Sequence, residues 1–137
     1  MEQHVFVRVG DSENFYNSYS QKIWGILTDS SLLREGQILW FVTSDTATGG
    51  NGRIIAVARF VSKVGRLHTN AELGWCKEPG EQDLRYEINY EDIYDLQYLE
   101  SEILKNPYKD RECIHVVKES VQIKRLDRLY NAIITLM

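Results

Sequence analysis

Two of the three tryptophans stand beside glycines, at positions where an indole ring can form one side of a binding pocket. Trp24 is followed by Gly25, and Trp75 is preceded by a glycine. Two facing indoles can enclose a flat base by stacking, and they can attract a cation to their ring faces. The third tryptophan, Trp40, lies in the apolar run QILWFVT and is expected in the core. Core packing remains the alternative for Trp24 and Trp75.

The residue types that most often act in catalysis or bind metals are dispersed along the chain. The three histidines, at positions 4, 68 and 115, have no cysteine or carboxylate at a usual zinc-ligand spacing. Cys76 and Cys113 also stand alone, which is typical of a protein from a reducing compartment. The glycine-rich stretch DTATGGNG lies at a predicted hairpin tip, not at the strand-to-helix turn of a phosphate-binding loop. We therefore predict no catalytic residue, no metal and no cofactor, and we expect the protein not to be an enzyme.

A length of 137 residues suits one domain with one substantial core, so residues 1–137 are predicted to form a single domain. The apolar and charged fractions, 43% and 26%, are those of an ordinary globular protein and argue against disorder. No stretch approaches the ~20 apolar residues that a membrane span needs, and the first residues do not resemble a secretory signal. We expect a cytoplasmic protein that binds no membrane.

The elements that position the tryptophans alternate between strand and helix patterns. The C-terminal helix is predicted over 121–136, because apolar residues recur three and four positions apart at 123, 126, 129, 133 and 136. A short helix is predicted from Asp11 or Ser12 to about Tyr19, and residues 92–104 mix helical and irregular signals. This order predicts an α+β fold, a curled sheet or small barrel flanked by helices. Strands are predicted over 4–9, 37–43, 53–64, 85–90 and 112–117, with 37–64 forming a hairpin and 22–26 a short apolar insert.

The net charge of −4 hides an uneven distribution. Residues 51–77 contain five basic residues and one acidic residue, and residues 113–137 contain four and two. Residues 78–112 contain four basic and eleven acidic residues. Since surface fields follow local charge and are screened over ~8–10 Å, a basic face for nucleic acid is compatible with an acidic protein.

Four segments resemble YTH domains, which recognise N6-methyladenosine in RNA. The first is VRVGDSENFYNSYSQKIW, in which Asn14 and Trp24 have the ten-residue spacing of the adenine-binding Asn or Asp and a cage tryptophan. The segment QILWFVTSDTATGGNGRIIAVARF resembles the hairpin beside the pocket, and ELGWCKEPG places Trp75 where the family has a second cage tryptophan. The closing segment NPYKDRECIHVVKESVQIKRLDRLYNAII has Lys118 where a phosphate-contacting arginine is common. The chain is also similar to EVE domains, which share the PUA-like fold.

The resemblance implies a PUA-like fold and a pocket for a modified base, formed by Asn14, Trp24, Gly25 and Trp75. The two indoles would enclose the methyl group, a backbone carbonyl near Trp24 would accept the remaining N–H, and Asn14 would donate to a ring nitrogen. The alternative for Asn14 is a hydrogen bond with its own backbone at a helix start. Candidate phosphate contacts are Arg8, Arg53, Arg66 and Lys118, with Arg59 and Lys63 as further basic residues nearby in the sequence.

The expected partner is therefore a nucleic acid with a modified base, either single-stranded RNA or a base flipped out of DNA. An EVE-type reader of modified cytosine is one alternative. A protein-interaction module that uses the acidic, tyrosine-rich segment 86–98 is a second. An enzyme, the third, would need His68 or Glu72 close to Trp75.

Overall fold

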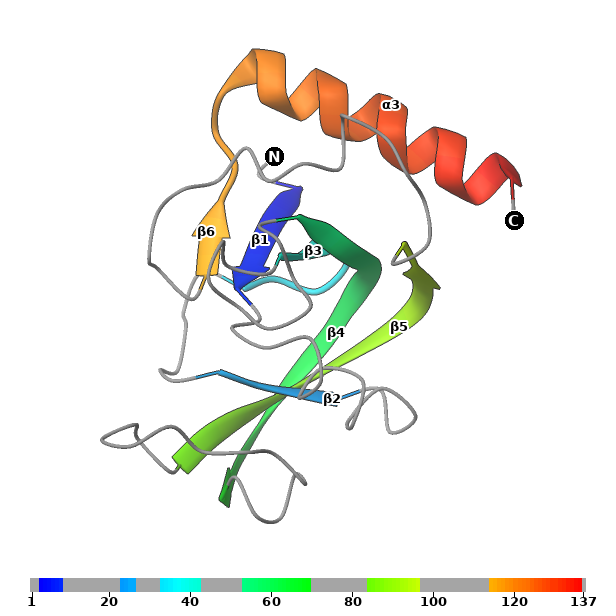
Figure 1. The fold of residues 1–137 in the computed structure, drawn as a ribbon. Helices are drawn as coiled ribbons and strands as arrows, with labels where there is room; N and C mark the ends of the chain where they lie inside the picture. The colour runs from blue at the N-terminus through cyan, green and yellow to red at the C-terminus, as the bar shows by residue number, and fades with distance from the viewer. Residues whose placement is uncertain are drawn as a thin grey trace.

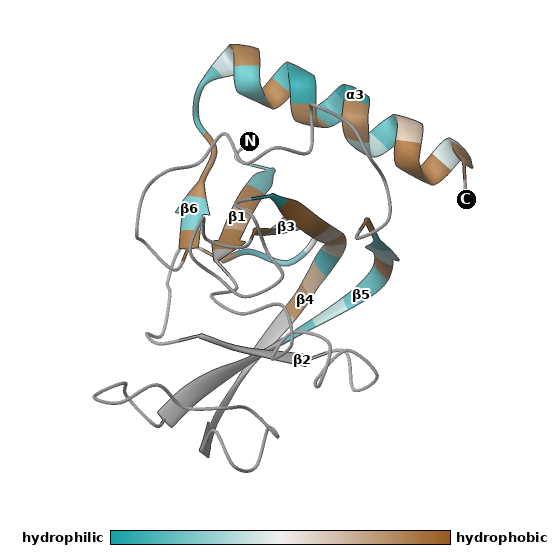
Figure 2. Cartoon of the chain, in the orientation of Figure 1, coloured by the Kyte–Doolittle hydropathy of each residue, from teal (hydrophilic) through white to brown (hydrophobic). Residues whose placement is uncertain are grey.

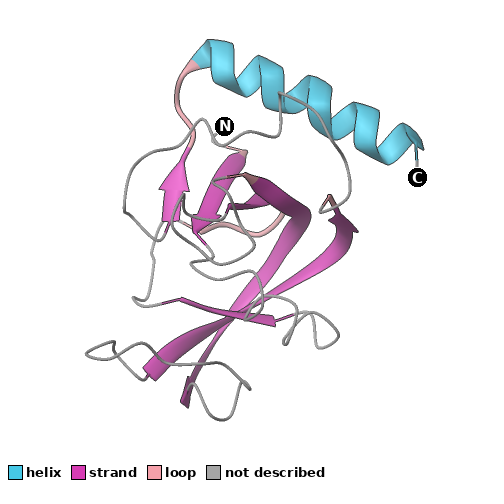
Figure 3. Cartoon of the chain, viewed as in Figure 1, coloured by secondary structure: helices cyan, strands magenta, loops and turns pink. Residues whose placement is uncertain are grey.

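The fold of the chain is given by a computed structural model. It describes residues 3–8, 23–26, 33–42, 53–69, 84–96 and 114–136, with side chains except at residues 8, 23–26, 62–69 and 84–88. Within these ranges, six strands form one sheet in the order β2-β5-β4-β3-β1-β6. The helix α3 (Ser120–Leu136) lies across one side of this sheet, as Figures 1 and 3 show.

The sheet is mixed, because its first and third strands run in the same direction. β1 (His4–Arg8) pairs in parallel with β3 (Ile38–Val42) and antiparallel with β6 (Ile114–Val116). The remaining pairs, β3 with β4 (Ile54–Thr69), β4 with β5 (Leu84–Asp95) and β5 with β2 (Ile23–Ile26), are antiparallel. The strand that carries Trp24 is thus one end of the sheet, and β6 is the other.

The central strand β3 is buried on both faces, which is why its sequence is an almost unbroken apolar run. Leu39 and Phe41 belong to a core cluster on the face away from α3. Trp40 belongs to the cluster on the opposite face, which α3 covers with Leu126, Tyr130 and Ile133. The apolar colouring of β3 and the first part of β4 beneath the helix is visible in Figure 2. The prediction that Trp40 lies in the core is confirmed by its exposed fraction of 0%.

The two long strands β4 and β5 are paired through three register shifts. One falls between the pairs Val57–Tyr94 and Arg59–Glu91, where β5 contains one residue more than β4. Asp92 lies in this extra stretch with a φ of 50°, the left-handed conformation that a β-bulge can require. Extra residues increase the local twist, so the pair crosses the sheet at a steep angle (Figure 1).

The predicted strands and C-terminal helix are confirmed, with two differences in extent and one additional strand. β4 continues to Thr69 rather than ending near residue 64, and the apolar insert is the end strand β2. The mixed helical and irregular prediction for 92–104 is wrong at its start, because β5 continues to Asp95 through the bulge. The helix predicted from Asp11 or Ser12 lies outside the described residues. No helix in the described ranges is long and apolar enough to cross a membrane.

The helix α3 presents a narrower apolar stripe to the sheet than its sequence predicts. Its buried residues are Leu126, Tyr130 and Ile133, with Ile123 and Leu129 partly buried beside them. Leu136, the last member of the predicted stripe, is 81% exposed because the helix extends past the sheet at its C-terminal end.

Candidate nucleic-acid interface

The predicted base-binding residues that the structure describes lie on the end strand β2. Trp24 pairs with Ile88 of β5, and Gly25 pairs with Glu87. Among the described strands, β2 is paired on one side only, with β5. Asn14 and Trp75, the other two predicted pocket residues, lie outside the described residues.

The basic part of β4 crosses the sheet close to this end strand. Ile88 pairs with Trp24 on one side and with Lys63 on the other, so one row of the sheet joins Trp24 to Lys63. A second row joins Ile26 of β2 to Leu67 of β4, because both pair with the same residue of β5. Arg66 is the residue of β4 directly before Leu67. Positions two strands apart are separated by about 10 Å, which is within reach of a base and its neighbouring phosphate.

Arg8 and Arg53 lie together at a different part of the sheet. The last residue of β1, Arg8, pairs with Val42, which in turn pairs with Ile54, the residue after Arg53. The Arg53 side chain is half-buried, and its Nη2 donates a hydrogen bond of 2.8 Å to the carbonyl of Leu96. Arg53 therefore joins the start of β4 to the end of β5, and part of its donor capacity is used within the fold.

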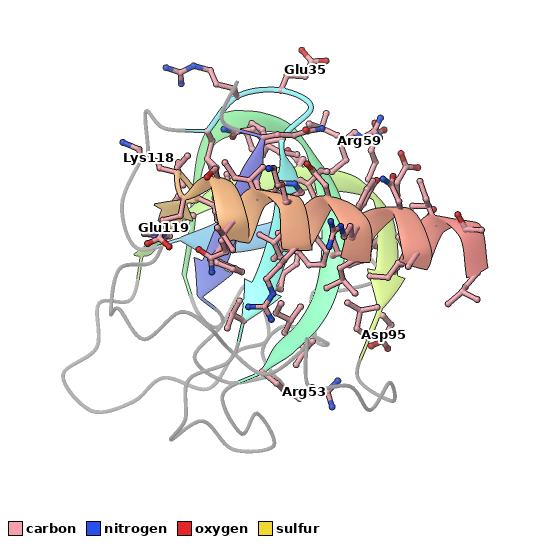
Figure 4. The ribbon with its side chains drawn as sticks, turned by 90° about the horizontal axis from the view of Figure 1, so that it is seen from above. Glu35, Arg53, Arg59, Asp95, Lys118 and Glu119 are labelled. Carbon is pink, nitrogen blue, oxygen red and sulfur yellow. The ribbon has the colours of Figure 1, made fainter. Side chains whose placement is uncertain are left out.

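Lys118 lies at a third place, just before α3, and its side chain is exposed. Figure 4 shows Lys118 and Glu119 at the N-terminal end of the helix, and Arg59 at the helix margin opposite to Arg53. The four predicted phosphate contacts are therefore spread over three places: Arg66 near β2, Arg8 with Arg53, and Lys118 beside α3.

Arg59 is exposed on the face of the sheet that α3 covers. A hydrogen bond with the Tyr130 side chain and the charge interaction of the two groups raise the pKa of the Arg59 guanidinium above its usual value. The carboxylates of Asp92 and Glu91 act in the same direction. Arg59 thus links α3 to β4, and the donor that it uses there is not available to a phosphate.

A buried polar chain, absent from the sequence predictions, joins β1, β3 and α3. The indole Nε1 of Trp40 donates to Nδ1 of His4 at 3.0 Å, and Nε2 of His4 lies 2.6 Å from Oδ1 of Asp127. Because the indole can only donate, Nδ1 must accept, and the imidazole proton is on Nε2, facing the carboxylate. His4 and Trp40 are both fully buried, whereas the Asp127 side chain is 48% exposed. These residues, hereafter the Trp40–His4–Asp127 triad, link the helix to the sheet.

Residues 89–96, the part of the acidic segment 86–98 whose side chains the structure describes, offer less surface than their sequence suggests. Tyr90 and Leu96 are buried, and Tyr94 packs against the cluster under α3. Among the side chains of this segment that the structure describes, those of Glu91 and Asp92 are exposed. The side chains of Tyr90 and Tyr94 pack in the core, because β5 is an inner strand with β4 and β2 on its two sides.

Among the described residues, no group of three or more His, Cys, Asp or Glu side chains could hold a metal ion.

The comparison with solved structures identifies the fold. The crystal structure of an ASCH protein from Zymomonas mobilis matches with a TM-score of 0.57 at 10% sequence identity, covering 94% of this chain and 96% of that one. A tyrosine-to-phenylalanine mutant of the same protein matches with a TM-score of 0.52 at 11% identity, covering 91% and 97%. No protein-family model and no curated protein matches the sequence. The chain has the α+β, PUA-like fold, as predicted.

Proposed function

We propose that the protein is a non-catalytic, cytoplasmic RNA-binding module that recognises N6-methyladenine in a single strand. The observation that carries this proposal is the placement of Trp24 and Gly25 on an end strand of the sheet, two strands from the positions of Lys63 and Arg66. The PUA-like fold and the resemblance of the sequence to YTH domains both support it.

The chemistry of the modified base fits these residues. N6-methyladenine keeps one exocyclic N–H and adds an apolar methyl group, so a pocket must offer one acceptor and an aromatic enclosure. In our proposal Trp24 and Trp75 enclose the methyl, a backbone carbonyl at Gly25 accepts the N–H, and Asn14 donates to a ring nitrogen. Stacking contributes about 1–3 kcal/mol per base, and burial of one methyl adds about 0.8 kcal/mol, which is roughly a fourfold preference.

A fluorescence titration with short single-stranded RNA tests the proposal. Four oligonucleotides of the same length would carry adenine, N6-methyladenine, cytosine or 5-methylcytosine at the central position. Trp40 is fully buried and serves as a constant background, so a change in tryptophan emission reports on Trp24 and Trp75. We expect N6-methyladenine to bind at least about fourfold more tightly than adenine, and Trp24→Ala to remove that difference.

The controls separate loss of the pocket from loss of the fold. Arg53→Gln replaces a candidate phosphate contact and no pocket residue, so it is expected to keep the full preference even where the affinity for all four oligonucleotides falls. Circular dichroism of Trp24→Ala and of Arg53→Gln must match the wild type. Tighter binding of 5-methylcytosine would replace the proposed base with a modified cytosine. Equal binding of all four oligonucleotides would refute base recognition, and turnover of bound RNA in a single-turnover incubation would refute the non-catalytic assignment.

A further inference from the structure

The outer surface of α3 carries three cations on one arc. Lys124, Arg125 and Arg128 are all exposed, and they lie within four positions of one another, so one turn of the helix presents them together. The buried residues Leu126 and Tyr130 point to the opposite side of the helix, into the core. We call the three cations the basic face of α3.

No described carboxylate lies within ion-pair distance of this face. The side chains of Lys124, Arg125 and Arg128 form no ion pair or hydrogen bond with a described residue. The acid within the same stretch, Asp127, has its Oδ1 atom 2.6 Å from Nε2 of His4, so its carboxylate is directed toward the sheet. The triad thus links the helix to the sheet, and it engages the Asp127 carboxylate with His4 and not with the cations of the basic face.

The positions of these cations do not stabilise the helix. Lys124 and Arg128 stand four positions apart and Arg125 and Arg128 three apart, and like charges at these spacings destabilise a helix. The last turn, where cations would complement the helix dipole, has no basic residue. Repulsion among three close cations is relieved when a polyanion binds, so the face is suited to a nucleic-acid backbone.

We propose that the basic face of α3 binds the phosphate backbone of RNA that extends beyond the modified base, an inference that rests on the proposed function. The helix lies at the top of the molecule in Figure 1 and β2 lies in its lower half, so one long strand is needed to contact both. The rise from residue 124 to residue 128 is about 6 Å, so the three cations lie close enough together to contact neighbouring phosphates of one strand. The contacts are independent of base identity.

Salt titrations with two RNA lengths test the inference. The wild type is compared with a variant carrying Lys124→Gln, Arg125→Gln and Arg128→Gln, each with a 6-nucleotide and a 24-nucleotide single strand containing central N6-methyladenine. Each lost phosphate contact lowers the slope of log K against log salt by ~0.7 for single strands. With the long RNA we expect the slope to fall by about 2, so that between 50 and 200 mM salt the wild type loses about 15- to 20-fold more affinity than the variant.

The short RNA and two further variants complete the design. The 6-nucleotide strand is expected to bind both proteins equally and to keep the same preference for N6-methyladenine. Arg34→Gln removes one exposed cation in the turn before β3, away from the helix, and should leave the slope unchanged, whereas Arg128→Gln should lower it. The charge-conserving variant with Lys124→Arg, Arg125→Lys and Arg128→Lys should bind long RNA like the wild type.

The two proposals fail in different ways. An unchanged slope for the triple glutamine variant with long RNA would overturn the role of α3, even when N6-methyladenine is preferred. Absence of that preference would overturn base recognition, even when the slope falls. A triple variant that loses binding to vesicles containing anionic lipid, and not to RNA, would also overturn the inference.

Discussion

Replacement of His4 by leucine should destabilise the protein more than the loss of any exposed ion pair. The imidazole is fully buried, and both of its nitrogens have partners in the Trp40–His4–Asp127 triad. Leucine has a similar volume but no acceptor, so His4→Leu leaves the buried Nε1–H of Trp40 without a partner, which costs about 1–3 kcal/mol. Loss of the hydrogen bond to Asp127 adds up to ~1 kcal/mol, because water can replace it at a half-exposed carboxylate.

The expected total is therefore about 2–4 kcal/mol of unfolding free energy, a large share of the ~5–15 kcal/mol typical of a domain. Asp127→Ala removes only the exposed end of the triad and should cost about 0.5–1.5 kcal/mol. Urea titrations followed by circular dichroism measure both values, since the midpoint shifts while the slope stays constant.

A double-mutant cycle decides whether the hydrogen bond to Trp40 is the cause. Trp40→Phe removes the indole donor and costs stability by itself through lost packing. If the unpaired donor dominates the effect of His4→Leu, the double variant should lose at least about 1 kcal/mol less than the sum of the two single losses. Additive losses, or a His4→Leu protein within about 0.5 kcal/mol of the wild type, would refute the reasoning.

Two further predictions concern local interactions. Arg59→Met should cost less than about 1 kcal/mol, because Arg59 is exposed. Since the Tyr130 side chain raises the pKa of Arg59, the stabilisation is fully present below the unfolded-state pKa and is lost only as the pH rises through the still higher folded-state pKa. Urea titrations at pH 6 and pH 9 should give equal losses, and a loss confined to one pH would contradict this assignment. Gly36→Ala should cost about 1–2 kcal/mol, because Gly36 has a φ of 88°. No atom lies within 4 Å of an added Cβ, so the loss is backbone strain, and Gly36→Asn should show a smaller loss in the same titration.

Local patterns in the sequence were sufficient for most of the elements. The apolar run through Trp40 predicts a strand covered on both faces, and the three- and four-residue spacing over 121–136 predicts the helix. The first part of the 92–104 prediction is wrong because Asp92 interrupts the alternation of β5 with a bulge that only the pairing with β4 accommodates. Residues 65–69 are polar enough to resemble a turn region, yet they pair with β5.

The residues of the candidate site were only partly predictable from the sequence, because contacts between distant segments decide where they lie. The resemblance to YTH domains singles out Trp24, but its position on an end strand follows from the pairing of β2 with β5, which no local pattern specifies. The charge count of residues 113–137 includes Lys124, Arg125 and Arg128. That none of them has an ion-pair partner among the described residues depends on the direction of the Asp127 carboxylate, which faces His4. The sequence shows Asp127 as a neighbour that could neutralise them.

By itself, the sequence determined most of the strands, the C-terminal helix and the residues that are apolar enough for the core, because hydrophobic periodicity is a property of residues close together in the chain. The tertiary structure decided which strands pair and which distant side chains come into contact. β1 pairs with β3 and β6, and His4 meets Trp40 and Asp127, which are 36 and 123 positions away. Such contacts form only when several segments pack at once, because a buried donor takes whichever acceptor the whole fold brings within reach.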